Sequence, residues 1–578
     1  MAKFSVSDVI VKAELCVLKG DIHKAKRLYG VILEKFPNHK RAKNGLASIH
    51  ATNLPSNDEI FSLLHLMKQQ KFEDAAIRAI NLTKKYPNFE LFWNALGTAS
   101  INLNCHERAV TAFKKVTELN SKSHEAFNNL GVALHGLRQL EDAAKAYHEA
   151  TCIDTSYSAA FFNLGNVLRD LKRFEEAIQN YNFCLNIEPN HLEALNNLAN
   201  VLCEMGELEK AVAYYRKAID LAPNNYKTYN NLGTTLIRLR RLVEAETAFL
   251  EAIKLNALAS EAKYNLGMLH WLKEDFIKAF DLLEWRSFGR HNPIAKYSRF
   301  GKPRWNGEKK LRLCVWKEQG LGDEIMFAST LSELTELSEK VLVECDPRLK
   351  NIYQRSFSGN IKFFDNKNTI SDDTYDVEIP IGSLPRHLRK HSNDFKRSAN
   401  SWLKADETKV LDFRQKLNGD INDKIIGLSW FTKSTLSNAL NRNLDVEMLA
   451  KYLKKLPVKF VSLQYGDISS DILRFKSEYG LEVTQVNWLD PYNDIDGLAS
   501  LIAACDTVIS CSNVTAHLSG ALGVDTRVLL PFDAGERWGL SQRTSYWYNS
   551  VTLYRQSKFR DWSEPFHKLE TDLISIFE

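Results

Sequence analysis

A spacing of 34 residues runs through the first half of the chain and constrains its fold more than any other feature. Alanine recurs at this interval, at Ala75, Ala109, Ala143, Ala177, Ala211, Ala245 and Ala279. Twelve residues before most of these stands a small residue, at Gly97, Gly131, Gly165, Ala199, Gly233 and Gly267. An aromatic ring follows at a fixed offset, at Phe113, Tyr147, Tyr181, Tyr215 and Phe249. Small residues at a constant phase predict that pairs of helices cross closely and repeat along the chain.

A 34-residue period of this kind is typical of tetratricopeptide (TPR) repeats. We therefore expect residues 1–289 to form an all-α TPR superhelix with a long concave face. The step from Ala25 to Ala75 is 50 residues rather than 34, which predicts an insertion near residues 42–56.

A ladder of asparagines lies inside the repeats, two residues before each small residue. At this phase the side chains should point to the concave surface, where a primary amide can bind the backbone of an extended peptide. The ladder resembles that in the TPR arm of the eukaryotic O-GlcNAc transferases. The alternative is that each amide only bridges adjacent repeats. The predicted acceptor-binding residues are Asn129, Asn163, Asn197, Asn231 and Asn265.

Charge and hydropathy exclude several classes of protein. The 76 basic and 71 acidic residues give a net charge of +5, which gives no reason to expect nucleic acid as a partner. No apolar run approaches the length of a membrane-spanning helix, and the N-terminal stretch lacks an uninterrupted signal-peptide core. The nine cysteines form no CxxC pair. We expect a cytoplasmic protein without structural metal or membrane insertion.

The second half has a different pattern, in which short apolar runs alternate with helical segments. This alternation predicts parallel sheets with helices on both faces, here as two Rossmann-like lobes over residues 311–404 and 405–578 after a connector at 290–310. Ligands in such sheets bind at the carboxyl ends of strands. The predicted strands are 311–316, 340–345, 361–365, 375–380, 424–430, 458–464, 481–486, 507–511 and 526–531.

The first motif that could carry chemistry is EQGLGDEIMF, which follows the first predicted strand. Gly320 and Gly322 permit close approach of the backbone to a ligand, and Asp323 stands near a helix start. A carboxylate there could take a proton from an attacking hydroxyl. The alternative is that Asp323 is only a helix cap.

The second motif is ISCSNVTAHLSGALG, where a predicted strand ends and a helix begins. Ser512, Asn513 and Thr515 bring hydroxyl and amide groups to the helix N-terminus, where free N–H groups favour a phosphate. His517 lies on the same helical face as Asn513. It could contact a donor phosphate or sugar, or be a half-buried structural histidine.

The third motif is GLSWFTKS, at the carboxyl end of another predicted strand. Trp430, Thr432 and Ser434 accompany Lys433, which could neutralise a phosphate or be a solvated loop lysine. Gln464 ends the next strand and could contact a nucleobase or ribose.

Taken together, these segments resemble the GT-B glycosyltransferases related to the ADP-heptose–lipopolysaccharide heptosyltransferases. GLGDEIMFASTL resembles their GxGD motif, and VISCSNVTAHLSGALG resembles their nucleotide-sugar loop and helix. KPRWNGEKKLRLCVWKEQGLGDEIMF and ERWGLSQRTSYWYNSVTLYRQ resemble a bacterial subgroup in which this domain is fused to TPR repeats. The resemblance covers roughly residues 290–578 and implies a two-lobed, metal-independent GT-B enzyme.

The resemblance also implies roles for individual residues. Asp323 falls on the position of the catalytic base, Lys433 near the phosphate-contacting loop, and Ser512 to His517 on the donor loop. The heptosyltransferases carry Asp, then Ser or Thr, then Gly where this chain has Ser-Asn-Val-Thr, so a heptose donor is not implied. Some TPR-fused members are flagellin glycosyltransferases that use a CMP-activated nonulosonic acid.

The sequence thus predicts a protein O-glycosyltransferase that needs no cofactor beyond its nucleotide-sugar donor. The TPR groove would hold a protein acceptor, and flagellin with a CMP-sugar donor is one form that fits the domain order. Two alternatives stay open, namely a transferase acting on a glycan or lipopolysaccharide and a non-enzymatic TPR adaptor with a degenerate GT-B domain.

Overall fold

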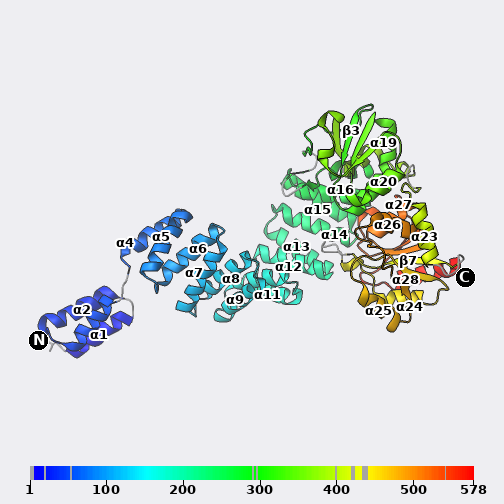
Figure 1. Ribbon diagram of the computed structural model, residues 1–578. Helices are drawn as coiled ribbons and strands as arrows, with labels where there is room; N and C mark the ends of the chain where they lie inside the picture. Colours follow the sequence, from blue (N-terminus) through cyan, green and yellow to red (C-terminus); the bar gives the residue numbers. More distant parts are fainter. Residues whose placement is uncertain are drawn as a thin grey trace. The chain divides into compact units, whose positions relative to one another are not determined.

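A computed structural model describes residues 6–18, 21–51, 55–288, 292–293, 297–396, 400–417, 423–432, 440–540 and 542–577 (Figure 1). The chain divides into two compact units, residues 1–198 and 199–578, and each is described by itself. The division falls inside the predicted repeat segment rather than at residue 289.

Unit 1 consists of helices that pack in consecutive pairs. The turn inside four of the pairs holds a residue in the left-handed conformation, at Gln70, Asn104, Arg138 and Lys172, with φ between 56° and 63°. These positions are 34 residues apart, so the turns are built alike. The helices are α1 (Val6–Leu18), α2 (Ile22–Lys35), α3 (Lys40–Ala51), α4 (Asn57–Lys68), α5 (Phe72–Lys85), α6 (Glu90–Asn102), α7 (His106–Leu119), α8 (His124–Gly136), α9 (Leu140–Ile153), α10 (Ser158–Asp170), α11 (Phe174–Ile187) and α12 (Leu192–Met205), which crosses the unit boundary.

The small residues of the 34-residue pattern lie where the two helices of a pair touch. A Cβ atom added at Gly131 would lie 2.6 Å from the ring of Tyr147, and one added at Gly97 would lie 2.6 Å from the ring of Phe113. Both rings are buried. The glycines therefore set the spacing between helices, as close-packed interiors require.

The segment predicted as an insertion is largely helical. Helix α3 occupies Lys40–Ala51, and its Ala42 is buried in one cluster with Tyr29 of α2. Residues 52–54 lie outside the described part of the chain.

Unit 2 begins with more repeat helices, which pack directly on the segment that follows the last sheet. Gly206, with φ +85, closes the turn after α12, and an added Cβ would collide with the ring of Phe559. The repeat helices of this unit after α12 are α13 (Leu208–Leu221), α14 (Tyr226–Arg238), α15 (Leu242–Leu255), α16 (Ser260–Leu272) and α17 (Phe276–Leu283).

A four-stranded parallel sheet follows the repeats, in the order β5-β4-β3-β6. Its strands are β3 (Arg312–Trp316), β4 (Lys340–Glu344), β5 (Ile361–Phe364) and β6 (Val377–Pro380). Its helices are α18 (Leu321–Phe327), α19 (Leu331–Leu337), α20 (Lys350–Ser356), α21 (Leu384–Leu388) and α22 (Ser392–Phe395). The short strands β1 (Ser287–Phe288) and β2 (Asn292–Pro293) pair in the connector.

A six-stranded parallel sheet completes the unit, in the order β12-β11-β10-β7-β8-β9. Its strands are β7 (Ile425–Ser429), β8 (Lys459–Ser462), β9 (Val483–Thr484), β10 (Thr507–Cys511), β11 (Asp525–Leu530) and β12 (Val551–Arg555). Its helices are α23 (Glu407–Leu417), α24 (Val446–Leu453), α25 (Ser469–Ser477), α26 (Ile495–Ala503), α27 (Val514–Leu522) and α28 (Ser563–Phe577). All nine predicted strand segments contain a strand, and β12 was not predicted.

The strand order reverses once in each sheet, between β3 and β6 and between β7 and β10. At such a reversal the loops leaving two neighbouring strands diverge, and a ligand can bind between them. The three sequence motifs follow β3, β7 and β10, so all of them lie at a reversal point.

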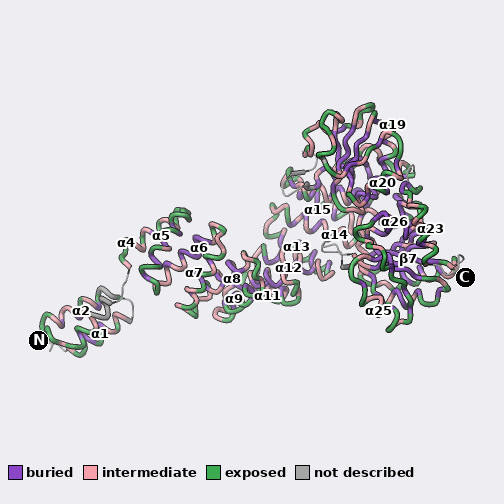
Figure 2. The backbone as a smooth tube through the Cα atoms, in the orientation of Figure 1, coloured by how far each residue is buried: buried purple, intermediate pink, exposed green. Residues whose placement is uncertain are grey.

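The two sheets share a hydrophobic core with the last repeat. One continuous cluster of buried residues joins Trp271 of α16 and Phe280 of α17 to Leu313 of β3 and Val508 of β10. Much of the backbone around β7 and α26 is accordingly buried (Figure 2). The end of the repeat array is therefore part of the same folded unit as the sheets.

Candidate functional site

Asp323 lies at the carboxyl end of β3, in the first turn of α18. Gly320 is the N-cap of this helix and has an extended backbone conformation. As a glycine it provides no side-chain hydrogen bond to the helix N-terminus. The Oδ1 atom of Asp323 accepts a hydrogen bond from Nε of Arg537 at 2.6 Å. Its side chain is 18% exposed, so the carboxylate is accessible to a ligand.

A pocket of about 520 Å³ opens in front of Asp323. The repeat helix α16 contributes Tyr264 and Asn265 to its wall, and Trp285 follows α17. Asn265 is the last residue of the asparagine ladder. The pocket therefore brings the predicted acceptor-binding residue and the predicted base to one space within unit 2.

Arg537 lines this pocket and supplies positive charge to it. Arg537 belongs to the short 3-10 helix η8 (Glu536–Trp538), and its Nη1 lies 3.0 Å from Oε1 of Glu536. Burial opposes the charged form of Arg537, but Asp323 and Glu536 outweigh burial and raise its pKa. Burial lowers the pKa of Arg442, and the neighbouring charge of Arg537 lowers it further.

The pattern of the sequence gave little sign of these arginines. Arg537 lies in ERWGLSQ, a segment that was noted only because it resembles the TPR-fused glycosyltransferases. Arg442 lies outside the three motifs. Among the described residues, no group of three or more His, Cys, Asp and Glu side chains could hold a metal ion.

His517 is buried and makes contacts within the protein that fit its structural alternative. Its Nδ1 lies 2.8 Å from the hydroxyl of Tyr548, and its ring stacks on Trp538 with centroids 5.0 Å apart. Burial lowers its pKa to about 4. A neutral, stacked imidazole forms the wall of the site and carries no charge for a phosphate near pH 7.

The remaining residues of the second motif are held largely by protein contacts. Asn513 caps α27, donates to Oγ of Ser429 at 2.8 Å, and accepts from Oγ of Ser510 at 3.0 Å. Ser512 accepts a hydrogen bond from Nε1 of Trp538 at 2.8 Å, and Thr515 is buried. Both ends of the Asn513 amide are thus used within the protein, and donor binding by this side chain stays a prediction.

Trp430 of the third motif and Gln464, which follows β8, both make hydrogen bonds within the protein. The Trp430 side chain is buried in the core and donates to Asp471 at 2.8 Å. Gln464 accepts from the backbone N–H groups of Trp430 and Phe431, at 2.8 and 3.0 Å, and donates to the Phe431 carbonyl at 3.2 Å. Both side chains hold the loop that leaves β7, and their contact with the donor stays a prediction.

Thr432 is the last residue of this motif that the structure describes. The backbone N–H of Thr432 donates to Oδ1 of Asn443 at 2.9 Å. Lys433 and Ser434 lie outside the described residues.

The two glycines of the first motif differ in their surroundings. No atom lies within 4 Å of a Cβ added at Gly320, so the backbone there borders open space. A Cβ added at Gly322 would lie 3.0 Å from Cδ2 of His517. Gly320 thus leaves room for a ligand, whereas Gly322 allows α18 to pack on α27.

The asparagine ladder bridges adjacent repeats in unit 1. Nδ2 of Asn163 donates to Asn128 at 2.9 Å, and Nδ2 of Asn197 donates to Asn166 at 2.8 Å. Asn129 accepts only a long contact of 3.5 Å from Asn128.

The same bridging occurs in unit 2, from Asn231 to Asn200 at 3.4 Å and from Asn265 to Asn230 at 2.9 Å. The bridges fix the orientation of the amides. No hydrogen bond from a described residue reaches Oδ1 of Asn265, which leaves a half-buried acceptor at the pocket.

Comparison with known proteins identifies the repeats. Tetratricopeptide repeat sequence models match residues 95–159, 156–224 and 190–257. The chain therefore contains TPR repeats, which confirms the interpretation of the 34-residue period.

One curated relative is Protein FlbA of Caulobacter vibrioides. It is 28% identical over 312 residues, which is 50% of this chain and 52% of the relative. The chain thus matches about half the length of that protein.

Several solved structures are similar over part of the chain. YrrB, described as a TPR protein with an unusual peptide-binding site, is 25% identical with a TM-score of 0.28, over 31% of this chain and 91% of its own. The C-terminal part of a TPR repeat-containing protein from Cytophaga hutchinsonii is 18% identical with a TM-score of 0.34, over 39% of this chain and 92% of its own.

A search of the described helices for one that is both long and apolar enough to cross a membrane finds none.

Proposed function

We propose that the protein transfers a sugar from a nucleotide-sugar donor to a Ser or Thr hydroxyl of a polypeptide. The observation that carries the proposal is the pocket in which Asn265 of the repeats and Asp323 of the β3 loop face the same space. The resemblance of the second half to GT-B glycosyltransferases supports the same reaction class.

Asp323 is the general base of the proposed reaction. It takes the proton of the acceptor hydroxyl while the hydroxyl oxygen attacks the anomeric carbon and the bond from that carbon to the phosphate oxygen breaks. The leaving nucleotide keeps the electron pair of that bond. Arg537, together with the N–H groups at the start of α27, would stabilise the negative charge.

The ion pair between Asp323 and Arg537 also links binding of the donor to the state of the catalytic base. A guanidinium group binds phosphate oxygens in bidentate fashion, so a donor phosphate competes with Asp323 for Arg537. Binding of the donor then releases the carboxylate for its role as base.

The acceptor side of the proposal rests on the repeats. In each unit the ladder amides are bridged through their N–H groups, and their carbonyl oxygens can accept hydrogen bonds from the backbone of an extended chain. Flagellin as acceptor and a CMP-linked nonulosonic acid as donor are specific forms of the proposal that the resemblance alone supports.

A non-enzymatic adaptor is the second candidate. It is favoured because several side chains predicted to bind the donor already make hydrogen bonds within the protein, above all those of Asn513, Gln464 and His517. A transferase acting on a glycan or lipopolysaccharide is disfavoured, because the ladder would then have no ligand.

Calorimetric titration with CMP-, UDP-, GDP- and ADP-linked sugars separates the enzyme from the adaptor. We expect one of these donors to bind, and Arg537→Ala to weaken that binding by about 10-fold or more, because a hydrogen bond to a charged group contributes about 1.5–3 kcal/mol. Arg543→Ala is the matched control, since Arg543 is 63% exposed and pairs with Asp572. Binding of none of the four donors would favour the adaptor.

A further inference from the structure

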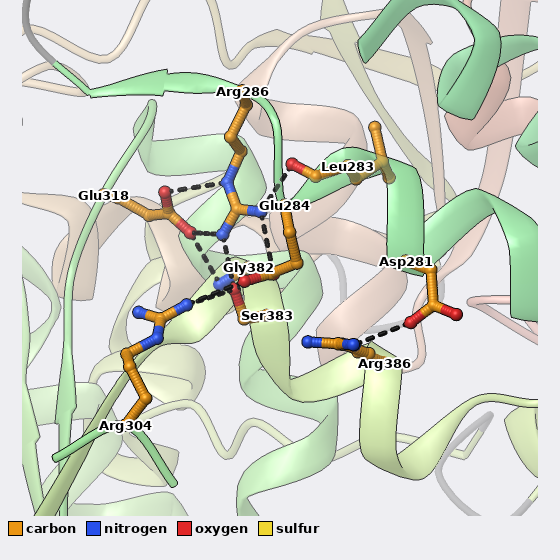
Figure 3. Close-up of polar contacts among 9 residues, drawn as sticks. All are labelled: Asp281, Leu283, Glu284, Arg286, Arg304, Glu318, Gly382, Ser383 and Arg386. Atoms are coloured by element: carbon orange, nitrogen blue, oxygen red, sulfur yellow. Dashed lines mark hydrogen bonds and ion pairs between the residues drawn. The ribbon is translucent and has the colours of Figure 1, made fainter. Parts of the chain in front are cut away.

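A buried polar network joins the end of the repeats to the loop that leads to Asp323 (Figure 3). Arg286, three residues after α17, donates from Nε to Oε2 of Glu318 at 3.0 Å and from Nη2 to Oε1 at 2.5 Å. Its Nη2 also donates to Oγ of Ser383 at 2.8 Å. The carboxylate of Glu318 accepts a further hydrogen bond from the backbone N–H of Gly382 at 3.0 Å.

The network is largely buried, although Arg304 is 24% exposed and Arg286 and Glu318 line the pocket in front of Asp323. The side chains of Arg286 and Glu318 are 7% and 3% exposed. A second carboxylate, that of Glu284, accepts from Arg304 at 2.8 Å and from the Ser383 hydroxyl. Two arginines and two glutamates therefore balance one another's charge, which a buried set of ions requires.

Glu318 determines the path of the chain toward Asp323. It stands five residues before Asp323, at the reversal point between β3 and β6. The next residue, Gln319, has φ of +63°, which is uncommon for a residue other than glycine, and Gly320 then caps α18. A conformation of this kind persists only when neighbouring contacts hold it.

The Glu318 carboxylate packs so closely against Gly382 that no larger residue fits there without a shift. A Cβ added at Gly382 would lie 2.5 Å from Oε1 of Glu318. The carboxylate is thus clamped between the Gly382 backbone and the guanidinium of Arg286.

The repeats also hold the opposite wall of the pocket. Nε1 of Trp271 in α16 donates to the hydroxyl of Tyr546 at 2.7 Å, and that hydroxyl donates to the carbonyl of Glu536 at 2.8 Å. Glu536 precedes Arg537, so α16 supports the arginine that pairs with Asp323.

We propose that Arg286, which follows the last TPR repeat, is a positioning residue. By binding the Glu318 carboxylate it holds the loop that orients Asp323. The proposal rests on the proposed function, because it assigns the clamp to the transfer step. It makes the repeats part of the catalytic geometry in addition to their role in holding the acceptor.

The test compares the variants Arg286→Lys and Glu318→Gln with the control variant Arg386→Ala, whose residue lies in the same region (Figure 3). Lys keeps the charge of Arg286 but cannot form two parallel hydrogen bonds. We expect kcat to fall at least 10-fold in both variants, with the Kd of the donor unchanged within twofold. Amide hydrogen exchange at residues 319–323 should become faster. Arg386→Ala removes the half-exposed ion pair with Asp281, 2.7 Å long, which does not touch Glu318, and should leave all three quantities unchanged.

Three outcomes would overturn the proposal: unchanged kcat and exchange in both variants, equal changes in Arg386→Ala, or loss of cooperative unfolding in both variants. In the last case the pair would hold the whole fold rather than one loop. If the unsubstituted chain transfers no sugar to any acceptor, the proposed function fails separately. The exchange measurement then still decides whether Arg286 holds the 319–323 loop.

Discussion

At the scale of single residues, the wall of the site depends on an imidazole that must stay neutral. His517 is 6% exposed, stacks on Trp538 and lies against Gly322 of α18. Its protonation would place a charge in this packed interface, beside Arg537. We therefore expect acid to weaken the packing of α18 on α27, which holds Asp323 in position.

This sensitivity gives a prediction about stability and pH. The pKa of His517 is about 4 in the folded chain, below its ordinary value of 6.5, because it is buried. The unfolded chain therefore takes up the proton first, so stability is fully present above pH 6.5 and falls as the pH drops toward 4. The loss is about 3 kcal/mol at most. His517→Gln should reduce the decline in urea-unfolding free energy over this interval.

The control is His567→Gln, because the side chain of His567 is 75% exposed and its replacement should leave the decline unchanged. Equal declines in His517→Gln and in the unsubstituted chain would show that acid acts elsewhere.

At the scale of elements, the repeats depend on contact between a glycine and a ring. Gly131 in α8 faces Tyr147 in α9 so closely that an added Cβ would lie 2.6 Å from the ring. Gly30 in α2 has no atom within 4 Å of the same position. Both glycines lie inside helices, but only Gly131 has a neighbouring side chain where a Cβ atom would be.

Substitution by alanine should therefore have opposite effects at the two sites. Gly131→Ala should destabilise unit 1 by about 1–3 kcal/mol, because the ring is buried and cannot move aside. Gly30→Ala should stabilise the chain by about 0.5–1 kcal/mol, because alanine favours the helix more than glycine does. Denaturant unfolding followed by helical circular dichroism measures both changes, and a stabilising Gly131→Ala would contradict this account of the repeat packing.

The elements that could be predicted from sequence are those set by local pattern. The 34-residue period gave the repeat helices, and continuous apolar runs gave the strands of both sheets, since a strand buried on both faces needs apolar residues throughout. Strand β12 was missed because it is an edge strand with two half-buried residues, Thr552 and Arg555.

The candidate site was harder to predict because its hydrogen bonds join distant residues. Asn513 binds Ser429, 84 residues away, and Asp323 binds Arg537, 214 residues away. A polar residue after a strand can either hold a loop or face a ligand, and only its partner distinguishes the two. The sequence could therefore place Asp323 at the site but could not tell that Gln464 and Trp430 make hydrogen bonds within the protein.

At the scale of the whole molecule, the boundary between the two compact units does not follow the sequence pattern. The repeats from residue 199 onward belong to the unit that contains both sheets, and Trp271 and Phe280 are in their common core. Arg238 of α14 also pairs with the buried Asp533 at 3.0 Å, in the loop that leads to Arg537. The last repeats are thus part of the proposed catalytic unit.

The central claim is that this unit glycosylates a protein by means of Asp323. The most direct test is the intact mass of flagellin, as trial acceptor, after incubation with the chain and the nucleotide sugar that binds in calorimetry. We predict a mass increase of one or more sugar residues, and a rate about 10²–10⁴-fold lower for Asp323→Asn, as expected for loss of a general base. Asp373→Asn, at an exposed carboxylate, should match the unsubstituted chain. Equal transfer by Asp323→Asn would contradict the account.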